Sequence, residues 1–327
     1  MRIVLYPRFA PDVLAIGRDL CPEGFDLVIS DPTDVTRLAE DVGRSDFVVG
    51  FVGPLPGPVW EAARSLRLIQ LLSAGYDNFP IEGARALRIP VATNGGANAI
   101  AVAEHAILLM LSVLRRLVQL DREVRAGSWR QTQRGDVRYH ELCGRRVGLV
   151  GMGMIGRQVA RRLHGFDVDL SYYDVRRLSP DEEMAIGTTY LSLDDLLSTV
   201  DVLSLHLPLL PETRGIVGAR ELALLRPDAV LINTARGELV DEPALVEALT
   251  SGRLAGAGLD VLAQEPPPRD HPLFALEQVV LTPHAAGPTW ESWPRRFANA
   301  YANVERVARG ESPLWVIPEL QDLLTNG

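Results

Sequence analysis

The chain has 327 residues, which is too long for one ordinary hydrophobic core and suits about two domains of roughly 100 to 200 residues each. Its 33 basic and 42 acidic residues give a net charge of −9, and the absence of a long Lys/Arg run argues against nucleic acid as a partner. The two cysteines, Cys21 and Cys143, offer neither a disulfide framework nor a cysteine-based metal site, and we expect both to be buried. These features favour a cytoplasmic protein that binds small molecules and no metal.

The chain also lacks the hydrophobic segments that export or membrane insertion requires. The N-terminal stretch MRIVLYPRFAPD has four apolar residues before Tyr6 and Pro7, so it predicts a first strand and not a signal peptide. The apolar stretch AIAVAEHAILLMLSVL is interrupted by Glu104 and His105, which indicates a core or interface helix. We therefore expect a soluble protein that does not bind a membrane.

Strand-like and helix-like patterns alternate over the first 94 residues. The strand-like runs are RIVLY, FDLVIS, DFVVG, RLIQLL and IPVATN, and the helix-like stretches include PTDVTRLAEDVG and PVWEAARS. This alternation predicts a parallel α/β sheet. A long helical segment follows, from about residue 98 to residue 126, and Gly127 is its single late break. We interpret this segment as a spine between two domains.

A second alternating series follows the long helix and predicts a second parallel sheet. Its strand-like runs are RRVGLVG, DLSYYD, DVLSLHLP, AVLINTA, LAGAGLDV and QVVLTPH. After Gly287 and Pro288, the segment TWESWPRRFANAYANVERVARG predicts one more helix.

The motif VGLVGMGMIGRQVARRL carries the strongest functional signal in the chain. It places Gly151, Gly153 and Gly156 in a GxGxxG spacing between an apolar strand and a helix. Such glycines permit a tight turn, close approach of the backbone to a pyrophosphate and close packing of the helix, whose N-terminal N–H groups face the anion. The motif therefore predicts a dinucleotide-binding site.

The residues after the next strand bear on the choice of cofactor. DLSYYD ends at Asp174, 18 residues after Gly156, where a carboxylate can accept hydrogen bonds from the adenosine ribose. The alternative interpretation of Asp174 is a turn or capping residue. Arg176 and Arg177 can hold the 2′-phosphate of NADP, but the carboxylate of Asp174 would repel that phosphate. The sequence therefore favours NAD, with NADP as the weaker alternative.

Three polar residues follow later strands of the second series. Arg236 follows LINTA, Glu265 follows GLDVLAQ and His284 follows VVLTP. Reduction of a 2-oxo acid requires a bidentate cation for the carboxylate, a proton donor for the carbonyl oxygen and a group that stabilises the protonated donor. Each residue alone is compatible with an ordinary loop role. Their shared placement at strand ends favours a catalytic site instead.

Taken in order, the motifs of the chain resemble the D-isomer-specific 2-hydroxyacid dehydrogenase family. The motifs are SAGYDNFP, NGGANAIAVAEHAILLML, GMGMIG, YYD, LHLPLLPETRGIVG, INTARGELVDEPAL, GLDVLAQEPPP and TPHAAG. The resemblance covers nearly the whole chain. It implies an NAD-dependent oxidoreductase that interconverts a small D-2-hydroxy acid and its 2-oxo acid by hydride transfer.

The resemblance also implies roles for individual residues. It places Arg236 at the substrate carboxylate, His284 as the acid/base that contacts the substrate, and Glu265 beside the histidine. It assigns Met154 and Ile155 to the pyrophosphate turn, Asp174 to the ribose, Leu207, Pro208 and Thr213 to the cofactor wall, Thr234, Ala235 and Arg236 to the nicotinamide surroundings, and Asp260 to the nicotinamide carboxamide. The backbone of Ser73, Ala74 and Gly75 is expected to meet the substrate carboxylate.

The domain layout follows from the same resemblance. Residues 1–98 and 288–327 are expected to form a discontinuous substrate domain, and residues 99–287 a dinucleotide-binding Rossmann domain. Both are parallel-sheet α/β domains of Rossmann-like or flavodoxin-like type with a cleft between them. The long helix implies a homodimer.

Departures from particular subtypes narrow the substrate. The chain ends soon after the returning helix, so we expect it to lack the regulatory domain of many phosphoglycerate dehydrogenases. Formate dehydrogenases usually have glutamine where Glu265 stands, and phosphite dehydrogenases have lysine where Ala74 stands, so both are weaker alternatives. An NADH-sensing, corepressor-like binding protein is a further alternative. Trp290 is either an apolar wall of the cleft or a structural aromatic at the start of a helix.

Overall fold

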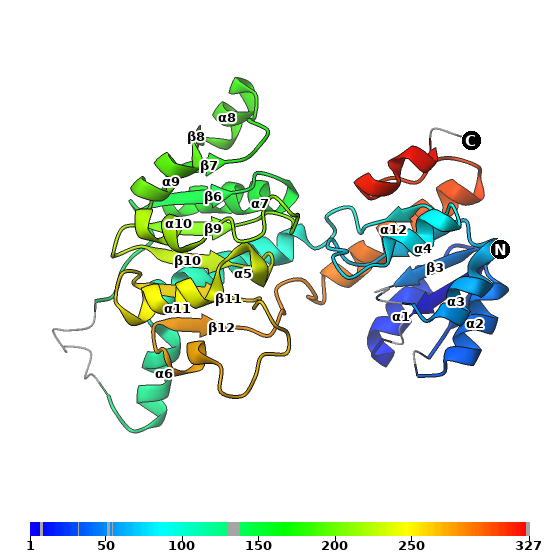
Figure 1. Ribbon diagram of the computed structural model, residues 1–327, viewed down its shortest axis with the longest axis horizontal. Helices are drawn as coiled ribbons and strands as arrows, with labels where there is room; N and C mark the ends of the chain where they lie inside the picture. The colour runs from blue at the N-terminus through cyan, green and yellow to red at the C-terminus, as the bar shows by residue number, and fades with distance from the viewer. Residues whose placement is uncertain (7–8, 32, 51–52, 54, 130–137, 325–327) are drawn as a thin grey trace. The chain divides into compact units, whose positions relative to one another are not determined.

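The computed structural model describes residues 1–6, 9–31, 33–50, 53, 55–129 and 138–324. The chain folds into two units, Met1–Asn98 with Pro288–Gly327, and Ala99–Gly287. Each unit is built on one sheet, and the paired strands within each sheet are parallel (Figure 1). The prediction of two parallel-sheet α/β domains is confirmed.

The described part of the first unit has a five-stranded sheet in the order β2-β1-β3-β4-β5. The strands are β1 (Arg2–Tyr6), β2 (Asp26–Ile29), β3 (Phe47–Gly50), β4 (Leu68–Leu71) and β5 (Val91–Ala92). The α-helices are α1 (Pro11–Asp19), α2 (Val35–Gly43), α3 (Gly57–Ala62), α4 (Ile81–Ala86) and α12 (Ser292–Ala308), with 3-10 turns η1 (Ala63–Ser65) and η5 (Pro318–Leu324). This strand order is that of flavodoxin-like folds.

Helix α12 comes from the C-terminal part of the chain and completes the core of the first unit. Its buried face includes Trp293, Phe297 and Tyr301. Phe297 packs so closely on Gly17 of α1 that a Cβ atom at Gly17 would lie 2.9 Å from the ring. The Tyr301 hydroxyl donates a hydrogen bond to the Gly17 carbonyl oxygen at 2.7 Å. The apolar face of one late helix therefore explains why this unit is discontinuous in sequence.

The described part of the second unit has a seven-stranded sheet in the order β12-β11-β10-β9-β6-β7-β8 (Figure 1). The strands are β6 (Arg146–Val150), β7 (Asp169–Tyr173), β8 (Thr189–Tyr190), β9 (Val202–Leu205), β10 (Val230–Asn233), β11 (Gly256–Leu259) and β12 (Val279–Leu281). The α-helices are α5 (Ala99–Leu114), α6 (Leu117–Arg125), α7 (Met154–Leu163), α8 (Pro180–Ile186), α9 (Leu193–Thr199), α10 (Ala219–Leu224) and α11 (Glu242–Thr250), with 3-10 turns η2 (His164–Phe166), η3 (Gly237–Leu239) and η4 (Pro272–Ala275). The chain order reverses between β6 and β9, and open α/β sheets bind ligands at the carboxyl ends of the strands at such a point.

Helix α5 packs against the sheet of the second unit through small residues of β11. A Cβ atom at Gly258 would lie 2.9 Å from the Leu109 side chain, and one at Gly256 would lie 2.8 Å from Val113. The two glycines therefore let α5 approach the sheet closely. The helix also contacts β10 and β12.

The long helix that the sequence predicts is divided into α5 and α6. Arg116 adopts a left-handed conformation with φ of 52°, and the Leu114 carbonyl oxygen accepts a hydrogen bond from the His140 backbone N–H at 2.9 Å. The expectation of one continuous segment was wrong because a distant backbone group takes the carbonyl that the next helical turn would use. Burial ends at the same point, since none of the described residues of α6 is buried.

Neither cysteine is fully buried, so that expectation was also wrong. Cys143 is exposed because it lies in the turn that precedes β6, and Cys21 is partly exposed after α1. In the described chain, no helix has the length and apolar character needed to cross a membrane.

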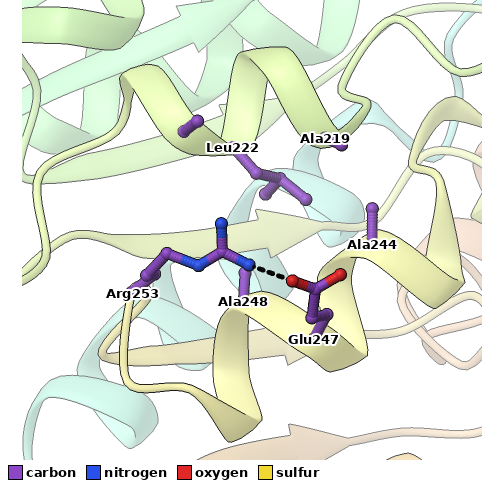
Figure 2. Close-up of a pocket in the computed structure, with 7 residues that line it drawn as sticks. Ala219, Leu222, Ala244, Glu247, Ala248 and Arg253 are labelled. Atoms are coloured by element: carbon purple, nitrogen blue, oxygen red, sulfur yellow. Dashed lines mark hydrogen bonds and ion pairs between the residues drawn. The ribbon is translucent and has the colours of Figure 1, made fainter.

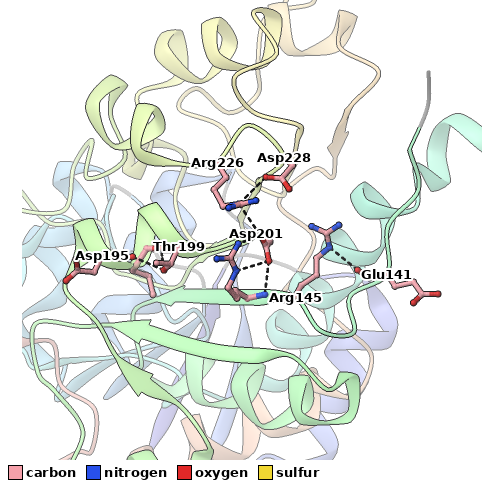
Figure 3. Close-up of polar contacts among 9 residues, drawn as sticks. Glu141, Arg145, Asp195, Thr199, Asp201, Arg226 and Asp228 are labelled. Carbon is pink, nitrogen blue, oxygen red and sulfur yellow. Dashed lines mark hydrogen bonds and ion pairs between the residues drawn. The ribbon is translucent and has the colours of Figure 1, made fainter. Parts of the chain in front are cut away.

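A charged cluster ties together the amino ends of the central strands in the second unit. Asp201, directly before β9, accepts hydrogen bonds from Arg146 Nη2 at 2.7 Å, Arg146 Nε at 3.2 Å and the Arg146 backbone N–H at 3.0 Å. Arg226 lies 3.5 Å from Asp201 and 3.2 Å from Asp228 (Figure 3). Burial raises the pKa of Asp201, but the hydrogen bonds from Arg146 outweigh burial and hold this pKa below its ordinary value.

This cluster gives a prediction about stability and pH. Asp201→Asn keeps the shape of the side chain and removes its charge, so the free energy of unfolding at pH 7 should fall by about 1–2 kcal/mol, the lower part of the range for charged hydrogen bonds because Arg146 is partly exposed. A carboxylate with a lowered folded-state pKa stabilises fully above its unfolded pKa of about 3.9, and this contribution is lost as pH falls through the folded pKa. Urea denaturation should therefore show a constant difference from wild type between about pH 7 and 5 that shrinks below about pH 4. The exposed neighbour provides a control, since Asp228→Asn should change stability by less than about 0.5 kcal/mol.

Candidate functional site

The turn between β6 and α7 has the shape of a dinucleotide cradle. A Cβ atom at Gly151 would lie 2.6 Å from the His206 carbonyl oxygen, and one at Gly156 would lie 2.2 Å from the Gly151 carbonyl oxygen. A Cβ at Gly153, by contrast, would meet no heavy atom of the described residues within 4 Å. Two glycines therefore allow the turn to pack, and the middle one leaves open space beside the backbone for a pyrophosphate.

The N-terminus of α7 and the end of β7 complete the expected nucleotide site. Met154 and Ile155 form the first turn of α7, and Met154 is exposed. Asp174 accepts hydrogen bonds from the Met152 backbone N–H at 2.7 Å and from the Arg176 backbone N–H at 3.0 Å. The carboxylate is thereby fixed at the mouth of the glycine turn, which suits a partner for a ribose hydroxyl.

The loop after β9 holds the residues expected in the cofactor wall. Leu207 is partly buried and Pro208 is exposed. The Thr213 hydroxyl donates to the Pro208 carbonyl oxygen at 2.7 Å and accepts from the Leu210 backbone N–H at 2.8 Å. Thr213 thus fixes the shape of this loop, and its expected contact with the cofactor stays a prediction.

The loop after β10 carries Thr234, Ala235 and Arg236 and is braced by Asn233. The Asn233 amide donates to the Arg236 carbonyl oxygen at 2.8 Å and accepts from the Ala235 backbone N–H at 3.0 Å. Arg236 Nη1 donates to the Ala235 carbonyl oxygen at 2.6 Å. The Thr234 hydroxyl oxygen is buried and has no hydrogen-bond partner among the described residues. A buried hydroxyl of this kind is suited to bind a polar ligand group at this edge.

Gly237 brings the Arg236 loop into backbone contact with the loop after β11. A Cβ atom at Gly237 would lie 2.0 Å from the Leu262 carbonyl carbon and 2.3 Å from the Ala263 nitrogen. Only glycine fits at this distance. The Leu262 backbone N–H in turn donates to Glu265 Oε1 at 3.0 Å, so the close approach links the Arg236 loop to the Glu265 loop.

Glu265 and His284, the two residues predicted to carry the acid/base chemistry, form a hydrogen-bonded pair. His284 Nδ1 lies 2.7 Å from Glu265 Oε2, and the two side chains are 49% and 39% exposed. Because a carboxylate only accepts hydrogen bonds, His284 Nδ1 must carry a proton. His284 Nε2 is then the nitrogen that can exchange a proton with a ligand.

Asp260, expected at the nicotinamide carboxamide, is buried beneath the His284 loop. Its Oδ1 accepts from the Thr282 hydroxyl at 2.5 Å and from the Ala285 backbone N–H at 2.8 Å. Its Oδ2 accepts from the Ala286 backbone N–H at 2.9 Å. The structure therefore shows Asp260 bound to this loop, and its contact with the cofactor stays a prediction.

In the first unit, the expected substrate loop follows β4. Ser73, Ala74 and Gly75 are partly buried, and the Ser73 hydroxyl donates to the Gly75 carbonyl oxygen at 2.7 Å. The buried Arg296 donates to the Leu72 carbonyl oxygen from α12 at 2.5 Å. Burial, assisted by the neighbouring Arg295, lowers the pKa of Arg296 to about 10. The buried Arg296 guanidinium therefore anchors the backbone directly before the Ser73–Gly75 loop.

Some parts of the predicted site are joined by contacts and others are not. The structure links the loops of Arg236, Glu265 and His284 within the second unit. The roles of Ser73, Ala74 and Gly75, and of the cleft, stay predictions. Trp290 lies before α12 with 58% of its surface exposed, and its role stays open.

Three residues that contact these loops or their anchors were not predicted from the sequence: Asn233, Thr282, and His105, whose Nε2 lies 2.9 Å from the Thr282 hydroxyl oxygen. Asn233 is the last residue of β10, and Thr282 directly follows β12. Since Arg236 and His284 were predicted from the ends of these same strands, strand-end placement could also have identified Asn233 and Thr282. His105 gave no such signal because it lies on a helix.

A pocket between α10 and α11 lies apart from these residues (Figure 2). It has a volume of about 60 Å³ and is lined by Ala219, Leu222, Ala223, Ala244, Glu247, Ala248 and Arg253. Two of these residues, Glu247 and Arg253, form an ion pair at 2.5 Å. Since ligand pockets usually measure about 300–1,000 Å³, it is too small for a dinucleotide.

Comparison with known proteins agrees with this geometry. Residues 107–286 match the model of the D-isomer specific 2-hydroxyacid dehydrogenase NAD binding domain. A glyoxylate reductase of Korarchaeum cryptofilum is 41% identical over 285 residues, which cover 86% of this chain and 85% of that protein. The chain belongs to the D-isomer-specific 2-hydroxyacid dehydrogenase family.

Solved structures of this 2-hydroxyacid dehydrogenase family share the fold of the whole chain. A glyoxylate reductase from Paecilomyes thermophila matches with a TM-score of 0.84 and 30% identity, covering 98% of this chain and 99% of that one. An NADPH-dependent glyoxylate/hydroxypyruvate reductase from Sinorhizobium meliloti matches with a TM-score of 0.83 and 32% identity, covering 98% of both chains.

This 2-hydroxyacid dehydrogenase is therefore an NAD(P)-dependent oxidoreductase that interconverts 2-hydroxy acids and 2-oxo acids. The comparisons confirm the predicted family and enzyme class. They do not favour the corepressor-like, phosphite-type or formate-type alternatives.

The close approach at Gly237 gives a test of how the site is assembled. Gly237→Ala should force the Arg236 and Glu265 loops apart, because the added methyl group has no space against the Leu262 backbone. Overpacking of this kind costs about 1–3 kcal/mol. We expect a lower melting temperature and at least a tenfold loss of kcat/KM in 2-oxo acid reduction, since a shift of about 1 Å can cost a hundredfold.

Gly165 offers a matched control in the same unit. Gly165→Ala introduces the same methyl group where no heavy atom of the described residues lies within 4 Å. It should leave both melting temperature and kcat/KM near the wild-type values. Wild-type kinetics in Gly237→Ala would show that the two loops need no backbone contact.

Proposed function

We propose that this enzyme reduces a small 2-oxo acid, with glyoxylate as the first candidate, to its D-2-hydroxy acid and prefers NADH. The observation that carries the proposal is the hydrogen bond from His284 Nδ1 to Glu265, which leaves Nε2 of the half-exposed imidazole to meet a substrate at the strand edge that also carries Arg236. The relatives named glyoxylate reductase support the choice of substrate. When bound, the nicotinamide supplies or accepts the hydride at C2 of the substrate.

Arg236 binds the substrate carboxylate in this proposal. Its planar guanidinium can donate two parallel hydrogen bonds to the two carboxylate oxygens, which fixes the orientation of the 2-oxo group. Asn233 holds the Arg236 backbone, and Gly237 fixes the loop against the next strand end. The expected contact of the Ser73, Ala74 and Gly75 backbone with the substrate carboxylate stays a prediction.

His284 moves the proton. In the direction of reduction, protonated His284 Nε2 donates its proton to the carbonyl oxygen as that oxygen gains charge, and the product is the hydroxyl group. In the direction of oxidation, neutral Nε2 accepts the hydroxyl proton. Glu265, bound to Nδ1, orients the imidazole ring of His284. Its carboxylate also stabilises the positive charge of the imidazolium before His284 donates its proton.

Asp174 and the contacts of Arg177 favour NADH over NADPH. Arg177 donates to both carboxylate oxygens of Glu183, at 2.8 and 3.1 Å, and lies over the ring of Tyr190. These contacts commit Arg177 to α8, while the fixed Asp174 carboxylate faces the ribose position. The relative from Sinorhizobium meliloti is NADPH-dependent, so the preference for NADH is our inference from these side chains.

We further propose that the protein is a cytoplasmic homodimer that pairs through α5 and α6. Apolar side chains on these helices are exposed: Leu108, Leu117, Val118 and Val124, each between 46% and 52%. Apolar surface of this kind commonly marks a protein–protein interface.

A substrate panel combined with Arg236 variants tests the proposed activity. NADH oxidation is measured with glyoxylate and larger 2-oxo acids, and NADH affinity is measured by fluorescence titration of the same samples. Arg236→Lys keeps the charge but loses the bidentate geometry, so kcat/KM should fall about 10- to more than 100-fold, since a charged hydrogen bond contributes about 1.5–3 kcal/mol. Arg236→Ala should lose more, and NADH affinity should survive in both.

The matched control for Arg236→Lys is Arg253→Lys, an exposed arginine paired with Glu247. It should leave kcat/KM unchanged. Intact kinetics in both Arg236 variants would remove the carboxylate-binding role, and a joint loss of melting temperature and NADH affinity would assign Arg236 a structural role instead.

Asp174→Ala tests the cofactor preference. The wild-type kcat/KM should be higher with NADH than with NADPH, and the ratio should fall on the order of tenfold in the variant, because a ribose hydrogen bond is lost and repulsion of the 2′-phosphate is relieved. Asp169→Ala, at the opposite end of β7, should keep the wild-type ratio. Equal or better use of NADPH by the wild type would contradict the preference.

A further inference from the structure

We propose that His105, Thr282 and Asp260 form a positioning chain that holds the His284 loop in its working conformation from the side of helix α5. The inference rests on the proposed role of His284 as the acid/base. Neither His105 nor Thr282 belongs to the site predicted from the sequence. All three residues of the positioning chain, and His284 itself, lie within the second unit.

The anchor of this chain is the Asp260 carboxylate, which is 1% exposed. It accepts hydrogen bonds from the Thr282 hydroxyl and from the Ala285 and Ala286 backbone N–H groups. The Asp260 carbonyl oxygen accepts the His284 backbone N–H at 2.8 Å. Asp260 therefore binds the backbone on both sides of the His284 side chain, and buried hydrogen bonds to a charged group are among the strong ones.

The backbone of His284 needs such an anchor because of its conformation. His284 has φ of 53°, in the left-handed region that residues other than glycine rarely adopt. Strained conformations of this kind persist only where the surroundings hold them, and they concentrate at functional sites. The bonds from Ala285 and Ala286 to Asp260 hold the chain immediately after the strained residue.

Helix α5 contributes His105 to the positioning chain. His105 Nε2 lies 2.9 Å from the Thr282 hydroxyl oxygen and 3.5 Å from Asp260 Oδ1. The single hydroxyl proton of Thr282 goes to the carboxylate, 2.5 Å away, so the hydroxyl must accept from His105. The hydrogen-bond direction is therefore His105 Nε2–H to Thr282 to Asp260.

The place of His105 in the fold makes it a firm support. It lies on α5, which packs on the glycines of β11 and contacts β12, the strand that leads into the His284 loop. The His105 side chain is 16% exposed. His105 on this packed helix therefore positions Thr282, and Thr282 positions the Asp260 carboxylate. Asp260 in turn holds the backbone that orients the His284 side chain.

Isosteric variants test the chain. Thr282→Val removes the hydroxyl and keeps the volume, and His105→Leu removes the Nε2 donor. Each should slow hydride transfer about tenfold, measured as the single-turnover rate of NADH oxidation by stopped flow, with NADH affinity within about twofold of wild type. Thr282→Ser restores the hydroxyl and His105→Gln restores a donor at the place of Nε2, so both should recover most of the rate.

The single-turnover experiment separates positioning from damage to the fold. A variant that is merely less stable has fewer NADH-binding sites, which lowers the amplitude of the reaction and leaves its rate unchanged. Thr188→Val is the matched control, since the Thr188 hydroxyl is also buried in the second unit but bonds to the Leu170 carbonyl oxygen. It should keep the wild-type rate.

Two outcomes overturn the inference: wild-type rates in both Thr282→Val and His105→Leu, or losses that Thr282→Ser and His105→Gln do not recover. If Thr282→Val binds no NADH, the His105 pair of variants decides alone. His284→Gln distinguishes these results from a failure of the proposed function. A near-wild-type rate in His284→Gln would refute the acid/base role itself. If His284→Gln loses activity while Thr282→Val and His105→Leu keep the wild-type rate, only the positioning chain is refuted.

Discussion

The hydrogen bond between His284 Nδ1 and Glu265 Oε2 depends on the parallel pairing of β11 with β12. In that register Leu259 pairs with Leu281, so the two strands end together and their loops start at the same edge. The 2.7 Å contact then follows from short loops leaving adjacent strands. The same constraint places the Arg236 loop next to them, because β10 pairs with β11 up to Asn233 and Leu259. The proximity of His284 and Glu265, the proposed acid/base pair, and the position of the expected carboxylate-binding arginine are thus consequences of one sheet order.

Sequence patterns identified the strands and the strand-end residues because both have local causes. Buried strands are short apolar runs, and a polar residue directly after such a run must lie at the carboxyl edge of a parallel sheet. For this reason Arg236, Glu265 and His284 could be named from the sequence. Strand β8 (Thr189–Tyr190) was missed because its residues are not part of an apolar run and neither is buried, unlike the equally short β5 (Val91–Ala92).

Features that depend on distant parts of the chain could not be predicted in this way. The break after Leu114 depends on a backbone hydrogen bond from His140, and no glycine or proline marks it. The contact between His105 and Thr282 joins residues 177 positions apart. Residue type gives little help in such cases, since a histidine on an apolar helix is compatible with a buried structural role as well as with support of a loop.

In the second sheet, the charged cluster around Asp201 lies at the amino edge, and the predicted catalytic residues lie at the carboxyl edge. At the amino edge, Asp201 pairs with Arg146 and Arg226, so the cluster stabilises the sheet. At the carboxyl edge, the buried Asp260 carboxylate spends its hydrogen bonds on the backbone around His284, while the imidazole and the Glu265 side chain are partly exposed. A buried carboxylate that binds loop N–H groups can hold a strained residue without competing for its proton, because backbone amides do not titrate. In the proposed mechanism, Asp260 therefore holds the loop while Glu265 holds His284 Nδ1, and this division leaves His284 Nε2 to exchange a proton with the substrate.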